Sequence, residues 1–400
     1  MHILYFTAEQ WPTFRVDITI LFGKYLPRLG ITCDLVTEQD ANNSTEKPWP
    51  AGKAILCKVP KSRAGQYVVK FLHQFKTLMF ADYKQYQAVQ VRDMTMIALL
   101  ALIMCKLHKK PFYYWLSYPQ SEGQIDRALA RGKSAGMRYW FPLIQGYVGK
   151  LLLYKIILPK ADHILVQSQN MLEMLKLQGI ASAKMTPVPM GVDLEIANPD
   201  IKPSDDTRLK GKRVLVYLGT LDKVRQIEML FHVLVIIKQK IPNIMLILAG
   251  DTEDVAHRAW LKQEAGALNI AEQVLFTGWL PMLEAWRFVR AAEIGISPFP
   301  RGYLLDMASP TKAVEYMAFG LPVVGNDNPD QAQVIAESSA GLCVKLEPDL
   351  FANTLLNLLN NPQQQAEMAV LGQAYAKKVR GYDSISEMLA GKYQQLNSTN

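Results

Sequence analysis

The segment Ser309–Val324, which reads SPTKAVEYMAFGLPVV, carries the strongest chemical signal in the chain. Ser309 is a favoured N-cap residue and Pro310 suits the first helical position, so a helix is expected to open here. Its free backbone N–H groups and its dipole would attract an anion, and the Thr311 hydroxyl lies beside them. Glu315, one turn further on, could accept two hydrogen bonds from a ribose diol. The alternative is an ordinary capped helix without a ligand.

A second candidate segment, GTLDKVR, spans residues 219–225 between an expected strand and an expected helix. Gly219 would let the backbone approach a phosphate, and Lys223 or Arg225 could neutralise a diphosphate. A plain turn with solvated cations is the alternative. Two further turns, Ala249–Asp251 and Pro187–Asp193, are ordinary when taken singly. Their order along the chain is what gives them weight.

Two series of short apolar segments alternate with helical stretches and predict two parallel sheets covered by helices. The expected strands are Ile3–Thr7, Thr32–Thr37, Ala54–Val59, Ala88–Val91, Pro111–Leu116 and Ile164–Gln167, then Arg213–Leu218, Ile244–Ala249, Val274–Thr277, Ile294–Ser297, Leu321–Gly325 and Leu342–Val344. A linker rich in Pro, Asp and Lys, Glu195–Gly211, separates the two series. We expect an α/β fold of two Rossmann-like domains, 1–195 and 196–375, facing each other across a ligand-binding cleft. A helical tail, 376–400, is expected to pack back toward the first domain.

The charge is unevenly distributed. Residues 51–160 contain 18 Lys and Arg against 4 Asp and Glu, a net +14, so the rest of the chain carries +8 − 14 = −6. Two segments, 53–76 and 131–160, each hold six basic residues and no acidic one, and the second is interleaved with aromatic residues. Such segments suit an anionic membrane surface. The alternatives are a solvated basic face and nucleic acid, and no nucleic-acid-binding signature accompanies the charge.

The cysteines and the apolar runs argue against several other classes. Four scattered cysteines are expected to be free thiols in a reducing cytosol. Cys105 and His108 have a spacing that zinc could use, but no second ligand pair accompanies them. The N-terminus reads as a strand and not as a secretory signal. The longest apolar run, Met94–Cys105, is too short to span a bilayer and is expected to be a buried helix.

Five ordered motifs between Pro187 and Asp327 resemble the retaining glycosyltransferases of family four, which have the two-domain GT-B architecture. The motifs are PVPMGVD, YLGTLDKVR, LILAGD, VLFTGWLP and SPTKAVEYMAFGLPVVGND. The segment ADHILVQSQNM, from Ala161, resembles the last strand of the family's N-terminal domain, so the resemblance covers nearly the whole chain.

The resemblance implies a donor site for a nucleotide-sugar, either a UDP- or a GDP-sugar. Glu315 would bind the ribose, and the turn formed by Ser309, Pro310, Thr311 and Lys312 would bind the diphosphate through its backbone. Arg225 occupies the place of the family's diphosphate lysine, with Lys223 as a nearby substitute, and both would stabilise the leaving group. Gly219, Gly250 and Asp251 would lie near the nucleotide, as would Thr220, which stands where the family often has arginine.

The sequence departs from the family pattern at two positions. Met307 replaces a glutamate that contacts the donor sugar, and the adjacent Asp306 is a candidate substitute. Ser117 or Tyr118 stands where many members have a catalytic histidine, and either hydroxyl could bind the donor sugar. Arg15 and Glu122 are expected on the acceptor side.

The resemblance implies transfer with retention at the anomeric carbon, without a protein nucleophile. We expect no cofactor and no metal, because no convincing metal-binding motif ends a strand. The leading hypothesis is a hexosyltransferase at the cytoplasmic membrane face that glycosylates a lipid-linked or growing glycan, as in exopolysaccharide or O-antigen synthesis. A soluble acceptor with the same fold and a catalytically silent binding partner are the alternatives.

Overall fold

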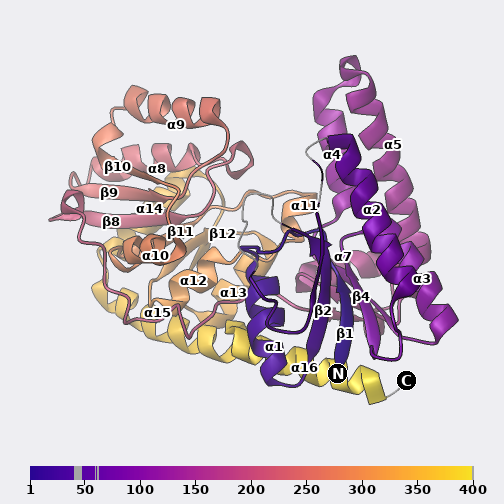
Figure 1. The fold of residues 1–400 in the computed structure, drawn as a ribbon. Coiled ribbons are helices and arrows are strands. Elements are labelled where there is room, and N and C mark those ends of the chain that lie inside the picture. Colours follow the sequence, from indigo (N-terminus) through magenta and orange to yellow (C-terminus); the bar gives the residue numbers. More distant parts are fainter. Residues whose placement is uncertain (40–46, 59, 61–62, 399–400) are drawn as a thin grey trace. The chain divides into compact units, whose positions relative to one another are not determined.

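The computed structural model describes residues 1–39, 47–58, 60 and 63–398 (Figure 1). The chain divides into two compact units. Unit 1 comprises Met1–Pro189 and Tyr382–Asn400, and unit 2 comprises Met190–Gly381. Val59, the last residue of one expected strand, and part of the basic segment 53–76 lie outside the described residues.

Unit 1 is built on a parallel sheet of seven strands in the order β3-β2-β1-β4-β5-β6-β7. The strands are β1 His2–Phe6, β2 Thr32–Glu38, β3 Ala54–Cys57, β4 Ala88–Arg92, β5 Phe112–Leu116, β6 His163–Val166 and β7 Met185–Pro187. Six of them match expected strands. The three-residue strand β7 was not predicted, because so short a segment carries little periodicity.

Helices lie between most of these strands along the chain. The helices of unit 1 are the π-helical Asp17–Tyr25 with α1 Leu26–Arg28, α2 Arg63–Phe80, α3 Thr95–His108, α4 Gln120–Arg131, α5 Met137–Leu152, α6 Leu158–Lys160, α7 Gln169–Leu177 and α16 Tyr382–Ser398. The π-helical segment Leu153–Ile157 joins α5 to α6. The apolar run Met94–Cys105 lies largely in α3, as expected, although Met96 and Ile103 remain exposed.

The last helix of the chain, α16, completes the core of unit 1. Ile385, Leu389 and Tyr393 are buried in one cluster with Tyr5 of β1 and Trp115 of β5. Burying these aliphatic and aromatic side chains is the main stabilising contribution of the helix. The end of the chain is therefore part of the first unit's core.

Unit 2 repeats the plan with six parallel strands in the order β10-β9-β8-β11-β12-β13. The strands are β8 Arg213–Leu218, β9 Ile244–Ala249, β10 Val274–Gly278, β11 Ile294–Ser297, β12 Val323–Asn326 and β13 Gly341–Val344. The helices are α8 Met229–Lys238, α9 Val255–Ala267, α10 Met282–Arg290, α11 Tyr303–Asp306, α12 Lys312–Ala318, α13 Pro329–Ser338, α14 Pro348–Leu359 and α15 Pro362–Tyr375. All six expected strands are present.

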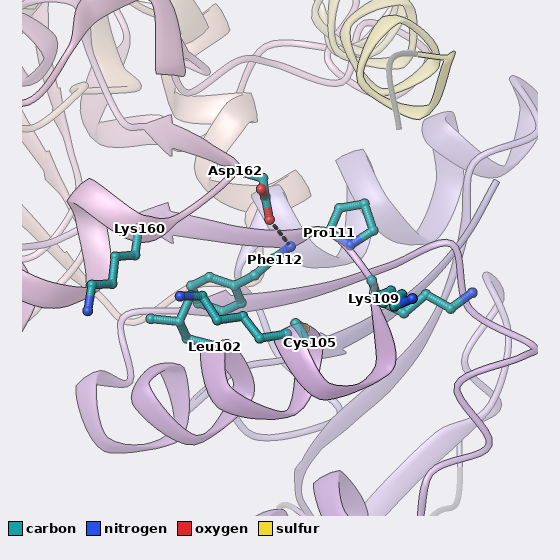
Figure 2. Close-up of a pocket in the computed structure, with 9 residues that line it drawn as sticks. Leu102, Cys105, Lys109, Pro111, Phe112, Lys160 and Asp162 are labelled. Atoms are coloured by element: carbon teal, nitrogen blue, oxygen red, sulfur yellow. Dashed lines mark hydrogen bonds between the residues drawn. The ribbon is translucent and has the colours of Figure 1, made fainter.

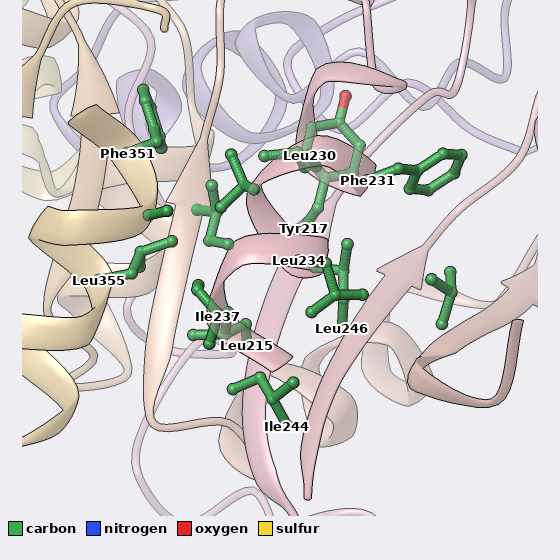
Figure 3. Close-up of a cluster of buried hydrophobic side chains, with 14 of the residues drawn as sticks. Leu215, Tyr217, Leu230, Phe231, Leu234, Ile237, Ile244, Leu246, Phe351 and Leu355 are labelled. Atoms are coloured by element: carbon green, nitrogen blue, oxygen red, sulfur yellow. The ribbon is translucent and has the colours of Figure 1, made fainter. Parts of the chain in front are cut away.

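One core cluster of unit 2 lies between its sheet and the helices α8 and α14 (Figure 3). Leu215 and Leu246 from the strands meet Phe231 and Leu234 from α8, and Leu355 from α14. Tyr217, at the end of β8, belongs to the same cluster and donates its hydroxyl to the carbonyl of Thr220 at 2.8 Å. This core thus fixes the turn that follows β8.

Candidate functional site

The strand order of unit 2 reverses between β8 and β11. In an open parallel sheet, ligands bind at the carboxyl ends of the strands beside such a reversal. The turn that begins at Gly219 follows β8, and Phe299 follows β11 by two residues. Both segments therefore lie at the edge where a ligand is expected.

Two glycines shape this edge by close backbone approach. Gly250 has φ 144°, and a Cβ there would lie 2.1 Å from the carbonyl oxygen of Gly219. Gly219 has φ 133°, and a Cβ there would lie 2.8 Å from Cε of Lys312. Glycine is required at both positions, because a side chain would meet the neighbouring turn or the lysine.

Lys312 and Arg225 bring two cations to this edge against aromatic rings. Lys312 Nζ lies 5.1 Å from the ring centroid of Tyr217, and the guanidinium carbon of Arg225 lies 4.7 Å from that of Phe299. Within the described part of the chain, neither cation forms an ion pair with a carboxylate. Nε and Nη1 of Arg225 are buried and have no hydrogen-bond acceptor among the described residues. Two such cations form a site with unused capacity for an anion.

Burial lowers the pKa of Lys312 to about 7, and the positive charge of Arg225 acts in the same direction. Only 9% of the Lys312 residue surface is exposed. Holding this amine in its charged form therefore costs free energy until an anion binds. Unpaired cations of this kind are typical of functional sites.

Glu315 lies one turn along α12 from Lys312 and is partly accessible. One of its carboxylate oxygens accepts a hydrogen bond from Nε1 of Trp286 at 3.4 Å. Burial raises the pKa of this carboxyl group, against the effects of Trp286 and Lys312. The helix itself is fixed to the sheet, since the hydroxyl of Tyr316 accepts the backbone N–H of Leu218 at 2.8 Å.

The expected N-cap at Ser309 is wrong. Helix α12 begins at Lys312 with Thr311 in the N-cap position, so Pro310 precedes the helix and does not open it. The Ser309 hydroxyl instead donates to Asp330 at 2.7 Å and accepts from the backbone N–H of Met190 at 3.0 Å. A buried hydroxyl with these partners holds the loop in place and cannot cap the helix.

Two expected donor-binding carboxylates are paired with arginines. Asp251 accepts from Nε of Arg258 at 2.6 Å. Asp306 accepts from Nε and Nη2 of Arg301 at 2.9 Å each, a two-point contact that occupies both of its oxygens. Met307, next to it, is buried. Both carboxylate oxygens of Asp306 therefore already accept hydrogen bonds from Arg301.

The two cations of the 219–225 turn differ in their surroundings. The residue Lys223 is exposed, whereas Arg225 is half-buried and stacks on Phe299. Thr220, in the same turn, uses its backbone carbonyl to accept from the Tyr217 hydroxyl. The geometry favours Arg225 over Lys223 as the group that meets an anion.

In unit 1 the strand order reverses between β1 and β4, and a buried ionic network lies just beyond β4. Nη2 of Arg92 donates to Asp17 at 2.6 Å, and its guanidinium also donates to the Ser117 hydroxyl at 3.0 and 3.1 Å. Ser117 in turn donates its hydroxyl and its backbone N–H to Asp93. The serine hydroxyl is therefore engaged on both its donor and acceptor sides.

Charge compensation sets the protonation states of this network. Burial would raise the pKa of Asp17, but Arg92 and Arg15 together lower it to about 2. Burial raises the pKa of Asp93, which Arg92 and Ser117 offset only in part. Asp93 also has φ 53°, an uncommon backbone conformation for a residue with a side chain.

The remaining candidates of unit 1 are Arg15 and Glu122, expected on the acceptor side, and Tyr118, expected near the donor sugar. Arg15 donates to Asp17 at 3.0 Å, so the structure brings it together with Arg92 and Ser117. The Tyr118 ring lies over Gly123 of α4, where a Cβ would be 2.6 Å from its hydroxyl. Glu122 is buried and lies 3.8 Å from Nζ of Lys150, and its oxygens accept no hydrogen bond from the described residues.

No group of three or more His, Cys, Asp or Glu residues positioned to hold a metal ion occurs among residues 1–39, 47–58, 60 and 63–398. Cys105 is buried, and the His108 ring stacks on Tyr83 with centroids 4.0 Å apart. The four cysteines are all free thiols.

Sequence reasoning missed several residues of these two edges. Arg92 and Asp93 directly follow an apolar strand, and a buried strand that ends in a charged pair is a signal that could have found them. Trp286 and Phe299 carry no such signal, because they join the site only through folding.

A second missed feature is the exposed face of α5. Met137, Phe141, Ile144, Val148 and Leu151 recur at helical spacing, and all are at least half exposed. The opposite side of the helix is buried against α4 through Tyr139 and Leu143. A contiguous exposed apolar patch is typical of a surface that contacts a protein, a membrane or a ligand.

The continuous helical stretch Met137–Lys160 is long and apolar enough to cross a membrane by length and composition. A third of its apolar 18-residue part is buried. Its later residues Leu153, Tyr154, Ile157 and Leu158 are buried in unit 1. A helix that supplies core residues over its last part cannot also be fully inserted in lipid.

Residues 201–375 match the family described as glycosyl transferases group 1, and residues 19–196 match the family described as glycosyltransferase family 4. The chain belongs to the family 4 glycosyltransferases of group 1. The resemblance seen in the sequence motifs is thereby confirmed.

Individual proteins give the same result at lower identity. The α-monoglucosyldiacylglycerol synthase of Streptococcus pneumoniae is 25% identical over 186 residues, which are 44% of this chain and 40% of that synthase. The matched region thus spans less than half of that relative's length. Among solved structures, sucrose-phosphate synthase of Thermosynechococcus elongatus superposes with a TM-score of 0.74 at 17% identity over 100% of both chains. HepE of Anabaena in complex with UDP-glucose has a TM-score of 0.70 at 15% identity, over 99% of this chain and 100% of that one. These structures share the two parallel α/β units of the GT-B fold.

Proposed function

We propose that this glycosyltransferase moves a hexose from a nucleotide-sugar to a lipid-linked acceptor at a membrane surface, with retention at the anomeric carbon. The pair of cations Lys312 and Arg225, unpaired beside the Gly219 turn and one helical turn from Glu315, carries the proposal. A diphosphate supplies the charge that this pair lacks, and a ribose diol matches the carboxylate of Glu315.

The reaction in this proposal needs few protein groups. The bond between the sugar C1 and the diphosphate oxygen breaks, and the acceptor oxygen bonds to C1 on the same face. The acceptor's proton passes to the departing diphosphate oxygen. Arg225 and Lys312 stabilise the negative charge that develops on the diphosphate. Such electrostatic stabilisation is usually the largest single contribution to catalysis.

UDP-sugars are the first donors to consider, because the solved structures of HepE contain UDP and UDP-glucose. The acceptor is proposed from the exposed stripe of α5 and from the exposed apolar residues Tyr67, Leu72 and Phe80 of α2. Both helices lie in the basic part of the chain. Apolar side chains with surrounding lysines and arginines bind anionic bilayers. The similarity to an enzyme named for a glycosylated diacylglycerol points the same way.

The test is transfer from radiolabelled UDP-glucose, UDP-galactose or a GDP-hexose to lipids in phosphatidylglycerol vesicles that contain diacylglycerol or a membrane lipid extract. The proposal expects labelled lipid with the anomeric configuration of the donor. Transfer only to a soluble sugar or sugar phosphate would move the protein to the soluble-acceptor class. Nucleotide binding without transfer or donor hydrolysis would favour a silent binding partner.

A further inference from the structure

A pocket of about 250 Å³ lies in unit 1, where α3 ends and β5 begins (Figure 2). Leu102, Cys105 and Phe112 form its apolar floor, and at most 4% of each residue is exposed. Ser117 follows the opposite end of β5, so the strand's length of roughly 16 Å separates this pocket from the ionic network at Arg92. The pocket is therefore a feature of its own.

Four lysines surround this apolar floor: Lys106, Lys109, Lys110 and Lys160. Figure 2 shows Lys160 and Lys109 on opposite sides of Phe112. The single carboxylate in the lining, Asp162, accepts the backbone N–H of Phe112 at 2.7 Å. None of the four lysines forms an ion pair with a carboxylate in the described part of the chain. The pocket therefore has a positive charge that the protein itself does not balance.

Stabilisation of a single helix end does not account for this cluster. Lysines near the last turn of α3 complement the negative end of its dipole, which explains Lys106 and Lys109. Lys160 comes from the end of another helix, α6, and faces the same hollow. Lys109 caps α3 with φ 51°, a left-handed conformation that a side chain rarely adopts.

We propose that this pocket binds the phosphate group of an organic phosphate. Lysine ammonium groups bind phosphate as point charges without demanding one geometry, which suits a rim of long and exposed side chains. A lipid headgroup and a soluble organic phosphate share this chemistry. The lipid source rests on the proposed membrane function, and the soluble source does not.

The neighbouring surface fits a lipid headgroup in particular. Leu107 of α3 is 70% exposed and lies in the same last turn as Lys106. The stretch that carries the exposed stripe of α5 ends at Lys160, on the rim. Basic pockets beside membrane-bound apolar surface are known to bind phosphorylated headgroups.

The experiment compares the wild-type chain with K106Q/K109Q/K160Q and with the matched triple K202Q/K210Q/K240Q. The second variant removes the same charge from exposed lysines away from the pocket. One arm measures flotation with phosphatidylglycerol vesicles against phosphatidylcholine vesicles. The other arm measures thermal stabilisation by sn-glycerol 3-phosphate.

The pocket triple is expected to lose about tenfold or more in phosphatidylglycerol binding relative to the matched triple, since each lysine near an anionic surface adds to the binding. Loss in the glycerol phosphate arm alone would support the pocket and identify a soluble ligand. Equal behaviour of the two triples in both arms would overturn the proposal. Thermal stabilisation by nucleotides, measured on the same variants, is absent only if the proposed donor site is wrong. A failure of the pocket proposal can therefore be told apart from a failure of the donor-site proposal.

Discussion

At the residue scale, Lys312 and Arg225 place two positive charges beside the Gly219 turn, and Glu315 lies one helical turn from Lys312. Arg225 and Glu315 stand in short motifs whose chemistry can be read from the sequence. The side chain of Lys312 was not predicted, because it reaches the site only by packing against Gly219, far away in the chain. The pairing of Asp306 with Arg301 was hidden for a similar reason, since both residues lie in a short irregular segment.

Replacing Arg225 by alanine is expected to lower kcat/KM for the nucleotide-sugar by about a hundredfold, as loss of a preorganised charge at a leaving group does. The lysine variant, R225K, is expected to recover only part of this loss, because the planar stack on Phe299 is lost. Steady-state kinetics with the donor varied would measure both. K223A is the matched control and should change kcat/KM by no more than about twofold. Equal losses in R225A and K223A would contradict the assignment.

The variant K312M is expected to be more stable than the wild type and to bind the nucleotide more weakly. The folded pKa of Lys312, about 7, lies below its ordinary value of 10.5, so the unfolded chain binds more protons between these two values. The lysine therefore destabilises the free protein most below pH 7, and this penalty is relieved as pH rises. Removing it should add about 1–3 kcal/mol at pH 6 and less at pH 9. Urea unfolding at both pH values measures this, and a destabilised K312M at pH 6 would contradict it.

At the element scale, the strands were predictable because apolar runs bounded by turn residues specify buried parallel strands. Eleven of the twelve expected strands lie wholly within described residues and were found, and Ala54–Val59 was found up to Cys57. The helix cap was not predictable, because the Ser309 hydroxyl donates to Asp330 and accepts from Arg380, which lie elsewhere in unit 2. The exposed stripe of α5 was visible only once α4 was known to cover the helix's other side.

The two glycine turns should differ in their response to alanine. G250A would press a methyl group into the Gly219 carbonyl, so we expect a loss of several kcal/mol or failure to fold. G219A meets the flexible Lys312 side chain and is expected to cost about 1–3 kcal/mol while reducing nucleotide affinity. Gly266 of α9 has open space around it and no positive φ, so G266A should be neutral or stabilising. Denaturation midpoints of the three variants test this order, and a harmless G250A would contradict the turn geometry.

At the scale of the whole molecule, two parallel α/β units were predictable from the two series of strands and the linker between them. A helical tail packing back toward the first domain was expected from residue 376, and the chain belongs to unit 1 from Tyr382 onward. The structure adds that exposed apolar side chains on α2 and α5 accompany the basic charge of residues 51–160.

The exposed stripe gives a test of membrane binding that is separate from the donor site. F141D/I144D is expected to lower binding to phosphatidylglycerol vesicles by about tenfold, because both apolar contacts are lost and negative charge is added. Flotation measures this, and nucleotide stabilisation should remain that of the wild type. L177D is the control, because Leu177 is 85% exposed on α7 of the same unit. Equal loss in L177D would show that any added negative charge suffices, and the stripe would have no special role.

The central claim is the nucleotide-sugar site of unit 2, and thermal stabilisation by UDP, GDP and ADP tests it most directly. One nucleotide should raise the melting temperature of the wild type, by an amount that corresponds to about 2.7 kcal/mol at a hundred times its dissociation constant. E315A and R225A should each lose most of this increase in melting temperature. If no nucleotide at millimolar concentration stabilises the wild type, or if E315A and R225A respond as the wild type does, the account of this site is wrong.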